Sequence, residues 1–223
     1  MTIAPGFVPT TEAAFIADLS DRDMNRVADE QILPSSLFDT THGRKFARLG
    51  AAFASFYFKT DTIFVAQFRR EVLRNLTARI ENRDNRAQLF DLIKTPSKSD
   101  LHIEIPDITS CDVHKFVHHA FARVKEINQA HALICSDASI MGGIPVFSGS
   151  RLPIESVLAS LDQGVELSEL QSDHPHVKLS LSKINAARLY MKIYPRKGRP
   201  LKTTEMSGCL KLIRQYRARG PSE

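Results

Sequence analysis

The amino-acid sequence predicts an α+β protein that is mostly α-helical, and three observations support this fold class. Apolar residues recur at three- and four-residue spacing over residues 61–80 and 111–130, which is typical of helices that bury one face. Apolar and polar residues alternate over 101–105, which predicts a strand. Glycine and proline divide residues 140–195 into short segments, which favours a group of small helices.

Composition places the 223-residue chain among ordinary globular proteins, with 43% hydrophobic and 25% charged residues. This excludes a fibrous or wholly disordered chain. No stretch approaches the ~18 apolar residues of a membrane helix, and residues 1–9 lack the features of a signal peptide. Three widely separated cysteines argue against a disulfide framework. We therefore expect a cytoplasmic protein without a membrane partner.

Residues 1–60 are expected to form the first domain, a winged helix-turn-helix. Residues 10–18 predict a short helix, and a second helix follows over 20–30, where the first residue is a serine suited to the N-cap. Pro34 ends this pair of helices. The segment 39–48 combines a glycine with three basic residues, which indicates a small basic wing.

Residues 61–135 are expected to form a spacer in two parts. The first part, 61–99, consists of a long amphipathic helix over 61–80 and a polar connector. The second part, 100–135, is predicted to run strand, helix, strand. Its elements are a strand over 101–105, a helix over 111–130 and a strand over 131–135.

The domain at 136–195 is expected to be a tri-helical helix-turn-helix that opens with a short β-hairpin over residues 140–154. Glycines in this opening indicate left-handed turns or a close backbone approach. Three short amphipathic helices are predicted to follow, and they end near Gly164, Pro175 and Pro195.

A resemblance to a known family is carried by this same domain. Its sequence reads Gly142-Gly-Ile-Pro-Val-Phe-Ser-Gly-Ser-Arg-Leu-Pro-Ile154, followed by Gly164 and Asp173-His-Pro-His176. The block resembles a widespread bacterial domain of unknown function, the one numbered four hundred and thirty-three. Many members of that family look like antitoxins that accompany a PIN-like ribonuclease toxin.

Residues 10–48 are similar, more faintly, to MerR-like winged helix-turn-helix domains. The combination of such a domain, a spacer and the C-terminal block resembles the longer VapB-type antitoxins. This resemblance implies a protein that binds a cognate toxin and operator DNA.

Eight residues are candidates for contact with DNA. Arg22 and Arg26 lie one turn apart on the second predicted helix, and basic side chains at that spacing suit a major groove. Aspartates surround them, so salt bridges on an acidic surface are the alternative. The wing has fewer acidic neighbours and suits backbone contacts. The candidates are Arg22, Arg26, Arg44, Lys45, Arg48, Lys178, Ser182 and Lys183.

The last three of these candidates begin the third predicted helix of the C-terminal domain, where a recognition helix meets DNA. However, Leu189 and Ile193 project from the face opposite Ile184. A helix that is apolar on two faces is usually buried on both. The alternative is therefore that this helix packs between domains or in a dimer.

A metal site is a further possibility that the sequence raises. Cys111, His114, His118 and His119 share one predicted helix and offer soft ligands, but a fourth ligand is not evident nearby. Partly buried histidines are the alternative. The chain contains no phosphate-binding glycine loop and no Gly-x-Ser-x-Gly, His-Glu-x-x-His or Cys-x-x-Cys motif. We therefore expect neither an enzyme nor a cofactor.

A basic tail is predicted at residues 196–223. Residues 176–223 contain twelve Lys or Arg against two Glu, which is the electrostatic pattern of a segment that binds a polyanion or an acidic protein. The tail is expected to bind the toxin; the alternatives are a solvated extension or docking on this chain itself. The expected toxin-binding residues are Arg196, Lys197, Arg199, Met206, Leu210, Ile213 and Arg214.

The sequence thus leads to an antitoxin that blocks a PIN-like ribonuclease toxin and represses its own operon. The apolar stripe that includes Phe68, Val72 and Leu76 further predicts a homodimer. A stand-alone helix-turn-helix regulator without a toxin is the main alternative. An accessory to a metal-dependent hydrolase is a third, disfavoured by the missing ligands.

Overall fold

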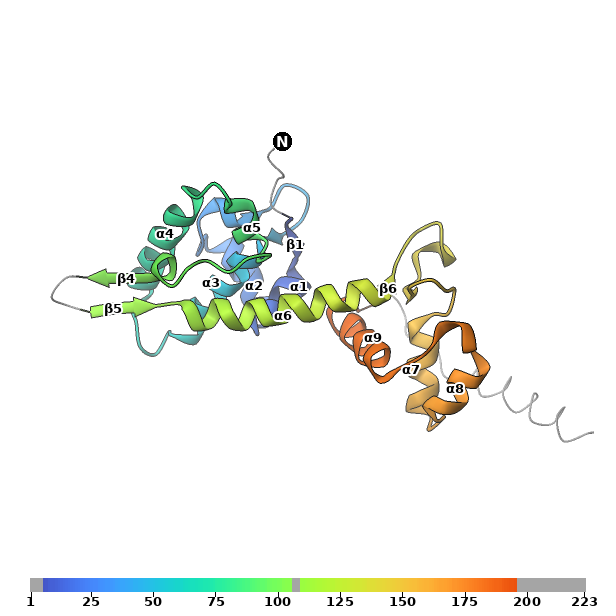
Figure 1. The fold of residues 1–223 in the computed structure, drawn as a ribbon. Coiled ribbons are helices and arrows are strands. Elements are labelled where there is room, and N and C mark those ends of the chain that lie inside the picture. Colours follow the sequence, from blue (N-terminus) through green and yellow to red (C-terminus); the bar gives the residue numbers. More distant parts are fainter. Residues whose placement is uncertain (1–5, 106–108, 196–223) are drawn as a thin grey trace, which may run out of the picture.

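The computed structural model describes residues 6–105 and 109–195 and consists of two units joined by one long helix, α6 (His114–Leu133) (Figure 1). The N-terminal unit lies along the first part of α6, and the C-terminal unit lies at its far end. Within the described residues, helices predominate and the strands form three small antiparallel sheets. The expectation of a mostly helical α+β protein is confirmed.

The N-terminal unit opens with a helix pair and a small three-stranded sheet of order β1-β3-β2. Helix α2 begins after Ser20, as expected, because the Ser20 hydroxyl accepts a hydrogen bond from the backbone N–H of Asp23 at 3.1 Å. Met24 and Val27 on its inner face are fully buried. The elements are β1 (Val8–Pro9), α1 (Thr10–Ala17), α2 (Asp21–Asp29), β2 (Phe38–Asp39) and β3 (Lys45–Phe46).

Helix α3 (Arg48–Lys59) was not expected from the sequence. All its residues from Leu49 to Tyr57 are buried, and apart from Gly50 and Ser55 they are apolar, so this stretch lacks the exposed polar residues that mark a surface helix. Gly50 lets it approach its neighbour closely, because a β-carbon there would lie 3.0 Å from the carbonyl oxygen of Leu37.

Helix α4 (Ala66–Glu81) begins five residues later than the expected 61–80 helix, and a turn precedes it. Val72, Leu76 and Ile80 are buried in the N-terminal core. The stripe that predicted a dimer is therefore largely covered within the chain. The connector that follows also contains a short helix, α5 (Arg86–Phe90).

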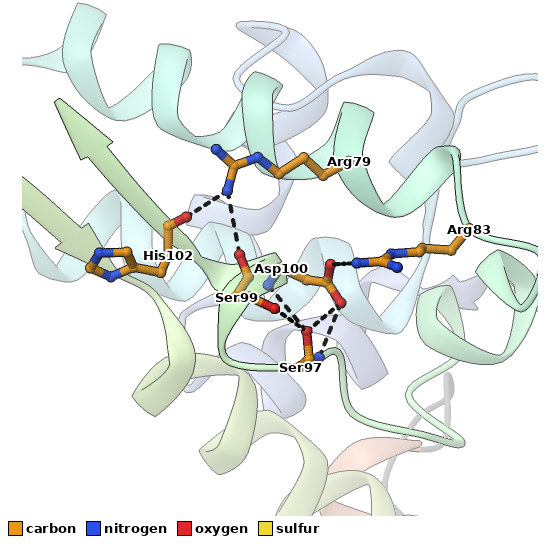
Figure 2. Close-up of polar contacts among 6 residues, drawn as sticks. All are labelled: Arg79, Arg83, Ser97, Ser99, Asp100 and His102. Atoms are coloured by element: carbon orange, nitrogen blue, oxygen red, sulfur yellow. Dashed lines mark hydrogen bonds and ion pairs between the residues drawn. The ribbon is translucent and has the colours of Figure 1, made fainter. Parts of the chain in front are cut away.

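A two-stranded hairpin, β4 (His102–Ile105) and β5 (Thr109–Asp112), projects from the N-terminal unit beside α4 (Figure 1). Its base is fixed to α4 by a polar network, drawn in Figure 2. Arg79 donates to the carbonyl oxygen of His102 at 2.6 Å, and Arg83 forms an ion pair with Asp100. Asp100 also accepts from the backbone N–H and the hydroxyl of Ser97, at 3.2 and 2.7 Å.

Helix α6 begins at His114, and its buried residues Val117, Val124 and Ile127 belong to the N-terminal core. The expected strand over 131–135 is too long, because residues 131–133 form the last turn of α6. Only β6 (Ile134–Cys135) is extended, and it pairs with β7 (Val146–Phe147). The expected hairpin at 140–154 therefore contributes one strand to a sheet with β6, and a single bridge joins Val146 to Pro153.

The C-terminal unit contains the three expected helices around a second core that includes Phe147, Ile154 and Ala187. Ser180 caps the last helix by accepting a hydrogen bond from the backbone N–H of Lys183 at 3.3 Å. The helices are α7 (Ile154–Asp162), α8 (Leu167–Asp173) and α9 (Leu181–Ile193).

Candidate nucleic-acid interface

Helix α2 and the β2–β3 hairpin form one continuous surface of the N-terminal unit. Arg44, just ahead of β3, reaches across to α2 and pairs with Asp29 at 2.6 Å. The same guanidinium donates to the side-chain oxygen of Asn25 at 3.4 Å. Arg44 therefore holds the hairpin at a fixed position beside the helix, and both elements can face one partner.

The hairpin is short and exposed at its tip. The Asp39 carboxylate accepts a hydrogen bond from the backbone N–H of Thr41 at 2.8 Å, and this bond lowers the pKa of Asp39. Gly43 has φ of 90°, a left-handed conformation that glycine adopts without strain. Lys45 lies opposite Asp39 in the antiparallel register and is exposed.

The two arginines of α2 have different surroundings. Arg26 pairs with Glu30 at 2.8 Å, lies 3.9 Å from Asp23 and sits over the ring of Phe58 at 5.3 Å. Its charge is therefore largely satisfied by acidic neighbours, as the alternative interpretation of this helix anticipated. Arg22 is exposed and, among the described residues, has no ion-pair partner, and the same holds for Lys45.

The expectation that Arg48 lies on the wing is wrong. The chain leaves the hairpin at Phe46, and Arg48 is the first residue of α3. Its side chain is 16% exposed and pairs with Glu12, which is 4% exposed, at 2.9 Å. Arg48 also donates to Asn128 of α6 at 3.3 Å. The Arg48 charge therefore joins elements of the fold and is turned away from solvent.

The three C-terminal candidates do not gather on a free helix face. Lys178 is exposed in a left-handed conformation before α9, whereas Lys183 donates its ammonium to the carbonyl oxygen of Val177. Ser182 lies in a hollow between α9 and α6 that Gln129 and Leu189 also line. Of the three, only Lys178 presents a fully exposed charge.

Helix α9 is instead buried on two sides, which was the alternative interpretation. Ile184 and Ala187 belong to the C-terminal core, whereas Ile193 belongs to the N-terminal core, and Leu189 packs against both. Just beyond the helix, the Tyr194 hydroxyl donates to the buried carboxylate of Glu12 and lies 3.1 Å from Nε2 of His131. Burial and the Glu12 charge raise the pKa of Tyr194. Helix α9 therefore connects the two units.

The candidate metal ligands are separated by the fold. Cys111 lies in strand β5, not on the helix, and is buried, which raises the pKa of its thiol. The rings of His114 and His118 are 6.0 Å apart. In the described part of the chain, no three histidine, cysteine or acidic side chains come together in a way that could hold a metal ion.

Asn25 and Glu12 are two residues of this region that were not predicted from the sequence to have a role. Asn25 is three residues after Arg22, and this helical spacing could have placed it on the same face. Glu12 gave no signal, because a single acidic residue in an apolar helix does not indicate which arginine pairs with it. The expected toxin-binding residues from Arg196 to Arg214 lie outside the described residues.

Comparison with known proteins places the C-terminal unit in a family. Residues 134–191 match the family described as "Protein of unknown function (DUF433)", so this unit is a DUF433 domain. The "Uncharacterized protein y4eO" of Sinorhizobium fredii is 27% identical over 189 residues, which cover 85% of this chain and 82% of that protein. This similarity extends well beyond the domain. No solved structure shows a significant match.

Within residues 6–105 and 109–195, no helix combines the length and the apolar character needed to cross a bilayer.

Proposed function

We propose that this protein is an antitoxin that neutralises a cognate PIN-like ribonuclease toxin and represses its own operon by binding operator DNA. The contact between Arg44 and α2 is the observation that best supports the DNA-binding part. It joins a short helix and a basic hairpin into one surface, which is the arrangement used by winged helix-turn-helix proteins. The resemblance to VapB-type antitoxins supports the toxin-binding part.

In this proposal α2 enters the major groove and the hairpin follows the adjacent backbone. Arg22 and Lys45 contact phosphates, because they are the exposed cations of this surface without an ion-pair partner among the described residues. Arg26 and Arg44 have acidic partners and serve mainly to shape the surface. Repression is then steric, and no chemical step is needed.

The DNA-binding part is tested with a gel-shift titration of the protein's own promoter DNA. We expect binding that weakens steeply with salt, because phosphate contacts release counterions. Replacing both Arg22 and Lys45 by alanine is expected to weaken binding to all sequences. The same double substitution at Lys94 and Lys98, two exposed lysines ahead of β4, removes equal charge and serves as the control.

The toxin-binding part is tested by co-purification with the product of the adjacent gene. A stable complex with a small PIN-like ribonuclease is the expected result. The second candidate is a stand-alone transcriptional regulator. It is favoured by the contact between Arg44 and α2, which supports DNA binding and needs no toxin partner. Promoter binding without any complex would support that alternative.

A homodimer remains part of the proposal, but its surface must differ from the expected stripe. Ile63 and Val65, in the turn before α4, are 70% and 73% exposed, and the half-buried rings of Phe64 and Phe68 have centroids 5.0 Å apart. This apolar turn is the better candidate for contact between copies. Light scattering at high micromolar concentration tests it, and a monomer would contradict the dimer.

A further inference from the structure

A cavity of about 520 Å³ lies in the N-terminal unit between α1, α3 and α6. Its volume falls within the range of small-molecule sites, which is about 300–1,000 Å³. The cavity wall is mostly apolar, and Ile16, Ala17 and the ring of Phe116 contribute to it. Ser55, which is 6% exposed, is a polar residue among them.

Basic side chains gather around this apolar wall. Lys59 at the end of α3 and Lys115, His119 and Arg123 on α6 all line the cavity. On α6 the last three are spaced four residues apart, which places them along one face of the helix. A cavity with an apolar wall and several cations suits a ligand that has an apolar body and a negative charge.

Among the described residues, Asp18 is the one acidic residue that lines the cavity, and it already has partners. Asp18 accepts hydrogen bonds from Lys59 at 2.7 Å and from Arg123 at 2.8 Å, and these bonds lower its pKa to about 2. Asp18 thus remains ionised and holds both cations at the cavity. Lys115 has no ion-pair partner among the described residues, so its positive charge remains available to a ligand.

We propose that this cavity binds a small organic anion with an aromatic or other apolar body, such as an aromatic carboxylate or sulfonate. The apolar part lies against Phe116 and Ile16, and the anionic group lies near Lys115 and His119. None of the described residues of the proposed DNA surface lines this cavity.

The test is a titration of the full-length protein with the fluorescent anion 8-anilinonaphthalene-1-sulfonate. The fluorescence of this anion increases when its rings enter an apolar site. We expect saturable binding at one site. Lys115→Glu is expected to weaken it about tenfold, as reversing a charge next to the anion costs roughly 1.4 kcal/mol. Lys125→Glu is the matched control, because Lys125 is an exposed lysine of the same helix that does not line the cavity.

A neutral analogue separates charge from apolar affinity. N-phenyl-1-naphthylamine has similar rings without the sulfonate, so it is expected to bind more weakly and to be insensitive to Lys115→Glu. Circular dichroism confirms that each variant is folded. The proposal is overturned if wild-type protein shows no saturable binding of the anion or if both lysine substitutions weaken anion binding equally. It is also overturned if the neutral analogue binds as tightly as the anion.

Discussion

Arg44 and Arg48 show that the sequence alone does not predict whether a basic side chain faces solvent or pairs inside the fold. Both belong to the same basic segment, and both were expected to contact DNA. Arg44 remains at the surface and pairs with Asp29 of α2, whereas Arg48 pairs with the buried Glu12. The sequence identifies the charge of each residue but not its partner, because the partners lie 15 and 36 positions away along the chain.

The buried pair leads to a prediction about stability. Arg48→Ala is expected to lower the free energy of unfolding by about 3 kcal/mol, because it leaves the Glu12 carboxylate without its cation inside the fold. Lys45→Ala, at an exposed position of the neighbouring strand, should change it by less than about 0.5 kcal/mol. Urea denaturation measures both. Equal stabilities of the two variants would show that the Glu12 pair contributes little.

A second prediction concerns pH and Asp100 at the base of the β4–β5 hairpin. Burial opposes ionisation of this carboxyl, but the hydrogen bonds from Ser97 and Arg83 outweigh burial and hold its pKa below the ordinary value. A lowered pKa in the folded state means that the stabilisation is present above the ordinary pKa of about 4 and is lost as pH falls below it.

Asp100→Asn is therefore expected to destabilise the protein by about 1 kcal/mol at pH 7 and by less at pH 3. Urea denaturation at the two pH values measures this difference. Asp162→Asn is a suitable control, because the Asp162 side chain is 71% exposed. If Asp100→Asn lowers the free energy of unfolding equally at both pH values, the prediction is contradicted.

At the scale of elements, amphipathic segments were predictable and fully buried ones were not. Helices α2 and α9 begin at serine caps that the sequence indicates. Helix α3 was not predicted, because it is buried on nearly all sides. For α9, the apolar residues Leu189 and Ile193 indicated correctly that a second face would be covered, but only the structure shows that the N-terminal core covers it.

The candidate DNA surface gives a prediction at this scale. Substituting Arg22 and Lys45 singly by alanine should each reduce the slope of log affinity against log salt by about 0.9, because each loss removes one phosphate contact. Thermal stability should be nearly unchanged, since both side chains are exposed. Gel-shift titrations at several salt concentrations measure the slopes. An unchanged slope for both variants would remove these residues from the interface.

At the scale of the whole molecule, the two units are joined by more than a linker. Helix α6 contributes residues to both cores, and Tyr194 returns from the C-terminal unit to Glu12 in α1. The hydrogen bond from Tyr194 to Glu12 joins residues that are 182 positions apart in the sequence. No local pattern could have predicted it.

The contact between Tyr194 and Glu12 lies at the end of the described chain and leads to a prediction about truncation. Tyr194 lies one residue before Pro195, so truncation after Pro195 keeps every described residue of both cores and the contact with Glu12. Residues 1–195 are therefore expected to fold and to bind operator DNA.

The removed residues 196–223 carry eight Lys or Arg against two Glu, together with the apolar residues Met206, Leu210 and Ile213. A PIN-like ribonuclease holds its metal ion with carboxylates, so a cationic segment can occupy its negative cleft. Charge speeds the encounter and apolar anchors slow release. The truncated protein should thus lose toxin binding in a pull-down while it retains the operator gel shift. Full inhibition of the toxin by the truncated protein would refute this assignment and direct the search to residues 100–135.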